Sequence, residues 1–125
     1  MGKILIVDDS FTMRESLTLV LENAGHFVWA AVNGLDGLDM YNKNTGKYDL
    51  IITDINMPEM NGLDFIINLR RINTTIPIVV LTTETEKDKM AIAKDNKASA
   101  WMVKPFKPND LLSVVNKIIS KSGGR

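Results

Sequence analysis

Short, unbroken runs of aliphatic residues recur along the chain. The clearest cover residues 4–7, 50–52 and 78–81, and two weaker ones cover 26–31 and 100–103. Runs of this length without polar interruption are typical of strands buried on both faces, as in parallel sheets. The pattern therefore predicts five buried parallel strands.

Apolar residues at helical spacing fill the intervals between these runs. One face lies in residues 13–24, with Ser10 or Thr12 as candidate N-cap and Gly25 where a C′ glycine belongs. Similar faces follow at 63–67 and 111–119, and thinner ones at 35–41 and 84–95. Strand–helix alternation repeated five times predicts an α/β fold, a doubly wound parallel sheet with helices on both faces.

The composition is that of an ordinary globular protein, with 45% hydrophobic and 24% charged residues among 125. This length suits one domain, so we expect a single domain over residues 1–125 that ends in a loose tail at 122–125. Fifteen basic residues balance fifteen acidic ones, which argues against a whole-chain nucleic-acid binder and predicts no direct contact with nucleic acid.

Some classes of site are excluded by residues that the sequence lacks. There is no cysteine, so disulfides and thiolate metal sites are ruled out. No apolar run approaches the roughly 20 residues that span a bilayer, and the first residues lack the pattern of a signal peptide. We therefore expect a cytoplasmic protein without membrane insertion.

Residues that can carry chemistry stand directly after the predicted strands: Asp8 and Asp9, Asp54, Thr82 and Thr83, and Lys104. Because the carboxyl ends of parallel strands share one edge of a sheet, these side chains should converge. Three carboxylates in one crevice suit a hard cation such as Mg²⁺, and a lysine suits a phosphoryl group. The combination predicts phosphoryl transfer. No nucleotide-binding glycine loop is present, so the donor should be another protein or a small phosphate.

Each of these residues also has an ordinary structural interpretation. Asp8 and Asp9 alone would be a turn with a helix cap, Thr82 a strand-end hydroxyl, and Trp101 a core aromatic. Only their combination at matched strand ends favours a site. Trp29 we assign to packing. His26 lacks a partner at metal-ligand spacing, and we expect it to be a surface or packing residue.

Four segments in order, VDDS, DINMPEMNG, LTTE and WMVKPF, carry a family resemblance over essentially the whole chain. They resemble the receiver domain of bacterial two-component response regulators, and most closely the stand-alone chemotaxis regulators of the CheY type. The resemblance implies a flavodoxin-like sheet with strand order 2-1-3-4-5.

The resemblance also implies roles for the residues at the strand ends. Asp54 would be the phosphoacceptor, with a sensor histidine kinase as donor. Asp9 would ligate Mg²⁺ directly and Asp8 mainly through water, with Asp54 and the backbone carbonyl of Asn56 completing the metal site. Lys104 would pair first with Asp54 and then with a phosphoryl oxygen.

A second group would read out and limit the phosphorylated state. Thr82 would bond the phosphoryl group and, by moving, let Trp101 turn inward. Asn56 and Glu84 lie at the positions that govern hydrolysis, and their identities resemble fast self-dephosphorylating regulators. One departure is Lys97, where the family commonly has glycine, so a turn with positive φ would strain it.

The implied output is protein binding. The surface of the fourth helix, fifth strand and fifth helix would dock a partner such as the flagellar motor switch, after phosphorylation by a kinase of the CheA type. A phosphatase could join these partners, and we expect a monomer. Such a chain catalyses its own phosphorylation and dephosphorylation but is a switch, not an enzyme.

Other functions stay open. The same receiver could act as a phosphorelay shuttle or a phosphate sink, or belong to a larger transcription regulator; the absence of a linker or DNA-binding segment favours the stand-alone case. A Mg²⁺-dependent aspartyl phosphatase is disfavoured, because Ser10 stands where the Asp-x-Asp motif needs its second acid. A flavin-binding flavodoxin relative is weaker still, because acids occupy the first loop.

Overall fold

The computed structural model describes residues 1–123 as five strands that alternate with five helices. In chain order they are β1 (Lys3–Val7), α1 (Phe11–Asn23), β2 (Phe27–Ala31), α2 (Gly34–Lys43), β3 (Leu50–Thr53), α3 (Gly62–Arg70), β4 (Ile78–Thr82), α4 (Lys87–Asp95), β5 (Ala100–Val103) and α5 (Pro108–Gly123). All strand pairs are parallel, and the sheet order is β2-β1-β3-β4-β5. The predicted fold class and strand order are confirmed.

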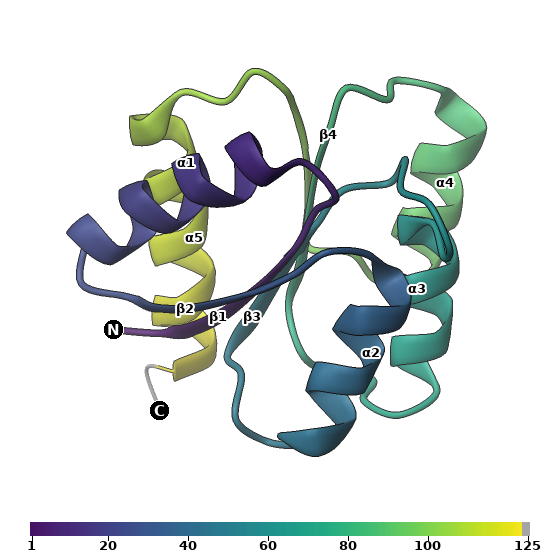
Figure 1. The fold of residues 1–125 in the computed structure, drawn as a ribbon, viewed down its shortest axis with the longest axis horizontal. Helices are drawn as coiled ribbons and strands as arrows, with labels where there is room; N and C mark the ends of the chain where they lie inside the picture. Colours follow the sequence, from purple (N-terminus) through teal and green to yellow (C-terminus); the bar gives the residue numbers. More distant parts are fainter. Residues whose placement is uncertain (124–125) are drawn as a thin grey trace.

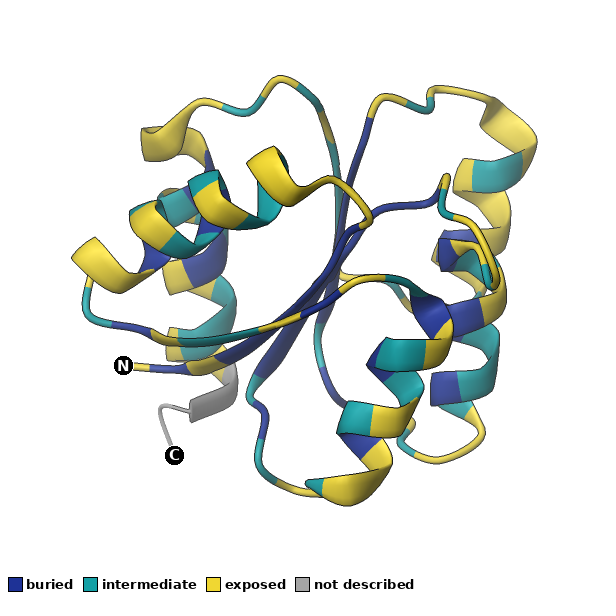
Figure 2. Cartoon of the chain, viewed as in Figure 1, coloured by how far each residue is buried: buried dark blue, intermediate teal, exposed yellow. Residues whose placement is uncertain are grey.

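Helices cover both faces of this sheet (Figure 1): α1 and α5 lie on one side, and α2, α3 and α4 on the other. Alternate residues of each strand point to opposite faces. In β1, Ile4 and Ile6 belong to the core beneath α1 and α5, whereas Leu5 and Val7 belong to the core beneath the other three helices. Strands β3 and β4 are therefore buried throughout and β1 is buried from Ile4 onward (Figure 2), which explains their unbroken aliphatic sequences.

Helix boundaries differ in places from the predicted ones. Ser10, not Thr12, caps α1, since its side chain accepts a hydrogen bond from Met13 N. The last helical pattern before β5 was expected to begin at residue 84, but α4 begins at Lys87. The earlier prediction is wrong because the amides of Glu84 and Glu86 bond to side chains of the loop, Thr82 and Glu84, instead of entering the helix.

Four of the described residues have positive φ: Gly25, Gly46, Glu59 and Lys97. Gly25 follows α1 at 94°, the predicted C′ glycine. Lys97 has a φ of 62°, the positive φ that its place in the sequence suggested. The Arg70 guanidinium donates to the carbonyl oxygens of Asn96 and Lys97 and so stabilises this turn. Glu59, after β3, takes 67° and was not foreseen.

The residues assigned to packing do pack. Trp29 meets the Tyr48 ring edge to face with centroids 5.7 Å apart. His26 is buried, accepts a hydrogen bond from Gly2 N and lies 2.8 Å from Asn116 Oδ1, so it joins β1 to α5.

At the end of the chain, α5 includes the first two residues of the expected tail at 122–125, and the last two lie outside the described residues. None of the helices described is long and apolar enough to cross a membrane.

Candidate functional site

Two aspartates meet at the carboxyl edge of the sheet because β1 and β3 end side by side. Val7 is the register partner of Thr53, so the next residues, Asp8 and Asp54, leave the sheet together. The amide of Asp54 continues the pairing by donating to Val7 O at 3.0 Å. Both carboxylates are buried, as convergence of strand ends predicts.

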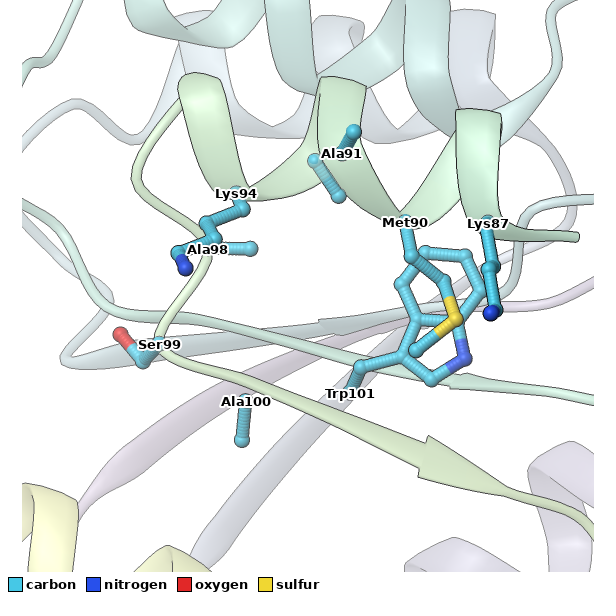
Figure 3. A pocket seen from close by; sticks show the side chains of 9 residues that line it. Lys87, Met90, Ala91, Lys94, Ala98, Ser99, Ala100 and Trp101 are labelled. Carbon is cyan, nitrogen blue, oxygen red and sulfur yellow. The ribbon is translucent and has the colours of Figure 1, made fainter. Parts of the chain in front are cut away.

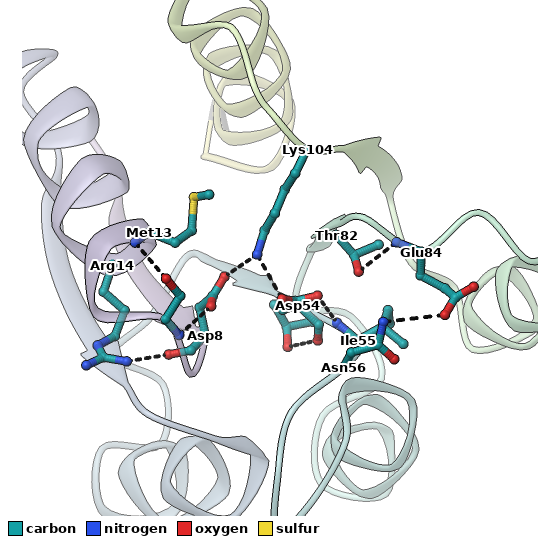
Figure 4. A network of polar contacts seen from close by, with 11 residues as sticks. Asp8, Met13, Arg14, Asp54, Ile55, Asn56, Thr82, Glu84 and Lys104 are labelled. Carbon is teal, nitrogen blue, oxygen red and sulfur yellow. Dashed lines mark hydrogen bonds and ion pairs between the residues drawn. The ribbon is translucent and has the colours of Figure 1, made fainter.

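Lys104 joins these two acids (Figure 4). Its Nζ lies 2.8 Å from Asp54 Oδ2 and 2.9 Å from Asp8 Oδ2. Its side chain is 11% exposed, that of Asp8 is 3% exposed and that of Asp54 is 9% exposed. Burial lowers the pKa of Lys104, but hydrogen bonds and charge from Asp54 and Asp8 outweigh it, so the pKa lies above its ordinary value. The expected pair with Asp54 is present, and the bond to Asp8 was not foreseen.

Further hydrogen bonds fix the orientation of the acids. Asp8 Oδ1 accepts from Ser10 N at 2.8 Å, and Arg14 Nη1 donates to the carbonyl oxygen of Asp8 at 2.7 Å. Asp54 Oδ1 accepts from Ile55 N at 2.6 Å. In each carboxylate, Oδ1 is therefore held by a backbone amide and Oδ2 pairs with Lys104.

The third acid completes a set of ligands that fits Mg²⁺. Asp8, Asp9 and Asp54 each offer a carboxylate oxygen, and these atoms lie within 4.8 Å of one another. Asp9 is exposed and Asp8 and Asp54 are buried, so the cluster opens to solvent on one side. Several hard anionic oxygens with room for water are the surroundings that Mg²⁺ favours.

The loop after Asp54 approaches the site so closely that only glycine fits at its end. A Cβ on Gly62 would overlap the carbonyl oxygen of Asp54, and Gly62 N donates to Ile55 O at 2.7 Å. Asn61 then caps α3 by accepting from Asp64 N. Gly62 therefore shapes this loop by allowing its backbone to lie against that of Asp54.

Glu84 connects the site to α4 and β5, and Figure 4 shows its contacts with Thr82 and Asn56. Its amide donates to Thr82 Oγ1 at 3.2 Å, and its carbonyl accepts from Trp101 Nε1 at 3.1 Å. Its carboxylate accepts from Lys89 at 3.0 Å and from the Asn56 amide at 3.4 Å. The hydrogen bond from Lys89 is the main reason that the pKa of Glu84 lies below its ordinary value.

Beside this loop, an apolar groove of about 500 Å³ opens between α4 and β5 (Figure 3). Met90, Ala91 and Ala98 line it together with the half-buried Trp101. Lys87 and Lys94 stand toward opposite ends of the α4 segment that borders it. Met90 therefore lines this groove at the surface.

The structure gathers Asp8, Asp9, Asp54 and Lys104 as the sequence predicted. The Thr82 hydroxyl accepts from Glu84, a contact that was not foreseen. Sequence reasoning missed two further residues, Arg14 and Lys89, because neither stands at a strand end. Each is an ordinary helix-surface cation by sequence, and no local pattern identifies its partner.

Known proteins are similar to this chain in sequence and in fold. The family model of the response regulator receiver domain matches residues 4–116. A chemotaxis protein CheY homolog of Campylobacter jejuni is 35% identical over 125 residues, covering 98% of this chain and 95% of the relative. The transcriptional regulatory protein CusR of Escherichia coli is 38% identical over 119 residues, 95% of this chain but 52% of that protein. The solved structure of the Vibrio cholerae chemotaxis protein CheY4 matches with a TM-score of 0.87 and 38% identity, covering 94% of this chain and 98% of that chain.

The chain therefore belongs to the response regulator receiver domain family. Receiver domains are signalling switches of two-component pathways, and they interact with histidine kinases and downstream targets. They generally bind Mg²⁺ at an acidic pocket, and this chain has an acidic cluster of Asp8, Asp9 and Asp54.

Proposed function

We propose that this chain is a phosphorylation switch in which Asp54 accepts a phosphoryl group from the phosphohistidine of a sensor histidine kinase. The observation that carries the proposal is the placement of Asp54 beside Lys104 and two further acids at the carboxyl edge of the sheet. Phosphoryl transfer needs both a nucleophile and positive charge, and this arrangement supplies both.

The residues of the chain divide the chemistry among them. A carboxylate oxygen of Asp54 bonds to phosphorus as the phosphorus–nitrogen bond to the kinase histidine breaks. Lys104, already 2.8 Å from Asp54, then pairs with a phosphoryl oxygen. Asp8, Asp9, Asp54 and the backbone carbonyl of Asn56 would hold Mg²⁺. When bound, this ion neutralises charge on the phosphoryl oxygens.

The readout would pass through Glu84 and its neighbours. Thr82 and Trp101 both bond to the backbone of Glu84, so a hydroxyl drawn toward the phosphoryl group releases the amide of the residue that holds the indole. The groove between α4 and β5 then changes shape, and the α4-β5-α5 surface binds its partner. Phosphorylation would bias a two-state equilibrium by differential contacts.

Chemotaxis is the pathway that the relatives favour. The Campylobacter jejuni homolog matches over nearly its full length, and Thr82, Thr83 and Glu84 resemble chemotaxis-type receivers. The kinase would be of the CheA type and the target a protein such as the flagellar motor switch. Asn56 and Glu84 would permit fast hydrolysis of the phosphorylated form.

A second candidate is the receiver of a transcription regulator, favoured by the 38% identity with CusR. A phosphorelay shuttle is a separate alternative. It predicts transfer onward from phosphorylated Asp54 to a histidine phosphotransfer domain, which a motility switch does not. Incubating the phosphorylated chain with such a domain and following the label separates the shuttle from the switch.

Beryllofluoride with Mg²⁺ tests the proposal, because it mimics a phosphoryl group on a carboxylate. The chain has two tryptophans, so Trp29→Phe leaves Trp101 as the reporter. We expect saturable change of Trp101 fluorescence that Asp54→Asn abolishes. No response with Asp54 intact, or an equal response in the Asp54→Asn variant, contradicts the proposal.

A further inference from the structure

The carboxylate of Glu84 is held mainly by α4. Lys89, in the first turn of that helix, donates to Oε1 at 3.0 Å, and the amide of Glu86 donates to Oε2 at 3.1 Å. The Glu84 side chain is 18% exposed and that of Lys89 34%. The pair therefore lies at the surface boundary, where an ion pair has a defined geometry without being sealed from water.

This carboxylate faces the loop that follows Asp54. The Asn56 amide donates to the same Oε1 atom, at 3.4 Å, which is a long contact. An interaction of that length cannot by itself fix a glutamate that has three rotatable bonds. The shorter bonds from Lys89 to Oε1 and from the Glu86 amide to Oε2 therefore fix where the carboxylate lies relative to Asn56. Of the two donors, Lys89 is the side chain, and it binds the same oxygen that faces Asn56.

We propose that Lys89 is a positioning residue: its ammonium group holds Glu84 against Asn56 and so sets the rate at which phosphorylated Asp54 is hydrolysed. The inference rests on the proposed function of Asp54. It adds a residue on α4 to the residues that control the lifetime, and thereby makes this lifetime depend on where α4 lies.

In the hydrolysis step, a water oxygen bonds to phosphorus while the bond between phosphorus and the Asp54 carboxylate oxygen breaks. Asp54 leaves as a carboxylate, inorganic phosphate keeps one proton of the water and solvent takes the other. Glu84 and Asn56 would line the approach of that water. A fixed approach favours attack, because orientation is part of the barrier.

The test compares decay rates after phosphorylation by acetyl phosphate with Mg²⁺ and removal of the donor, with intact mass as the readout. We expect Lys89→Met to slow decay about threefold, the range that one partly exposed ion pair permits. Lys89→Arg should restore most of the rate. An unchanged or faster decay in Lys89→Met overturns the proposal.

A matched control removes a different ion pair. Lys43 pairs with Asp39 at 3.0 Å on α2, with side chains 72% and 57% exposed, and Lys43→Met should leave decay unchanged. In a Glu84→Gln background, Lys89→Met should have no further effect. An equal effect with and without Glu84 would mean that Lys89 acts only on general structure, and would also overturn the proposal.

A third measurement does not depend on phosphorylation. In the unphosphorylated chain, Lys89→Met should shift the NMR signals of the Asn56 side-chain amide and the Trp101 indole N–H, and Lys43→Met should shift neither. Unmoved signals overturn the positioning of Glu84. If the wild-type chain takes no phosphoryl group from acetyl phosphate, the proposed function fails and the hydrolytic role of Lys89 fails with it, while these signals still decide whether Lys89 positions Glu84.

Discussion

The Asp54 site and the groove between α4 and β5 lie on the same sheet but are held together by different forces. At the site, Lys104 is bound to Asp8 and Asp54 by two short ion pairs among nearly buried side chains. At the groove, Trp101 is half-buried, Met90 is 37% exposed, and the indole makes one hydrogen bond to a loop carbonyl.

This difference suits the two regions to different tasks. Breaking a buried ion pair leaves a charge without a partner, so the site resists rearrangement. Rotating a half-buried aromatic over an open groove costs much less, so the groove can follow a signal. Glu84 touches both regions, since its amide bonds to Thr82 and its carbonyl to Trp101.

The largest effect should follow loss of the buried cation. Lys104→Met leaves the carboxylates of Asp8 and Asp54 facing each other without a counter-charge, and we expect the free energy of unfolding to fall by about 3 kcal/mol. Urea denaturation without Mg²⁺ measures it. Lys43→Met, which removes the exposed pair with Asp39, should cost less than about 0.5 kcal/mol. Equal costs for the two variants would remove the contrast between site and surface.

Gly62→Ala tests how tightly the site is enclosed. The added methyl group would overlap the Asp54 carbonyl oxygen, so the loop must shift. We expect about 2 kcal/mol of destabilisation and a slower uptake of phosphoryl groups from acetyl phosphate. Gly46→Ala probes backbone strain without a clash, because nothing lies within reach of a Cβ there, although Gly46 has positive φ. Unchanged phosphorylation kinetics in Gly62→Ala would show that the loop is not tightly packed on the site.

Alkaline pH should weaken the same ion pairs more gently. The pKa of Lys104 is raised above its ordinary value of 10.5 in the folded chain, so its contribution to stability is fully present below 10.5 and is lost as pH rises through the folded pKa. The loss should be smaller than that in Lys104→Met, since a neutral amine still fills the space. Urea denaturation across alkaline pH should show a steeper decline for the wild type than for Lys104→Met. Parallel declines would contradict the raised pKa.

Substitution in the groove should cost the least stability. Trp101→Phe keeps an aromatic ring but removes the indole hydrogen bond to Glu84, and we expect a loss of about 1 kcal/mol. Binding to a partner of the α4-β5-α5 surface should weaken more than stability does, and surface plasmon resonance with beryllofluoride present would measure it. A stability loss as large as that of Lys104→Met would show that the groove is as rigid as the site.

Much of the fold and of the site could be predicted from local pattern. The aliphatic runs of β1, β3 and β4 are buried on both faces, so their sequence carries the information directly. The strand-end position of Asp8, Asp54 and Lys104 then implied convergence, because all parallel strands end at one edge.

Prediction failed where side chains of a loop compete with the helix. The residues from Glu84 to Glu86 fit a helical pattern, yet the Thr82 hydroxyl and the Glu84 carboxylate capture their amides. The positive φ of Glu59 likewise follows from a loop braced by contacts, such as Gly34 N donating to Met60 O. A residue's own identity does not contain such information.

By itself, the sequence determined five parallel strands, the edge where the acids meet and the family to which the chain belongs, because hydrophobic period and motif order are local properties. Only the tertiary structure decided that Lys104 bridges Asp8, 96 positions away, as well as Asp54. It also decided that Lys89 anchors Glu84 and that a groove opens beside Trp101. Those contacts depend on how the helices pack on the sheet, and the spacing of residues along the chain does not encode the distances between their side chains.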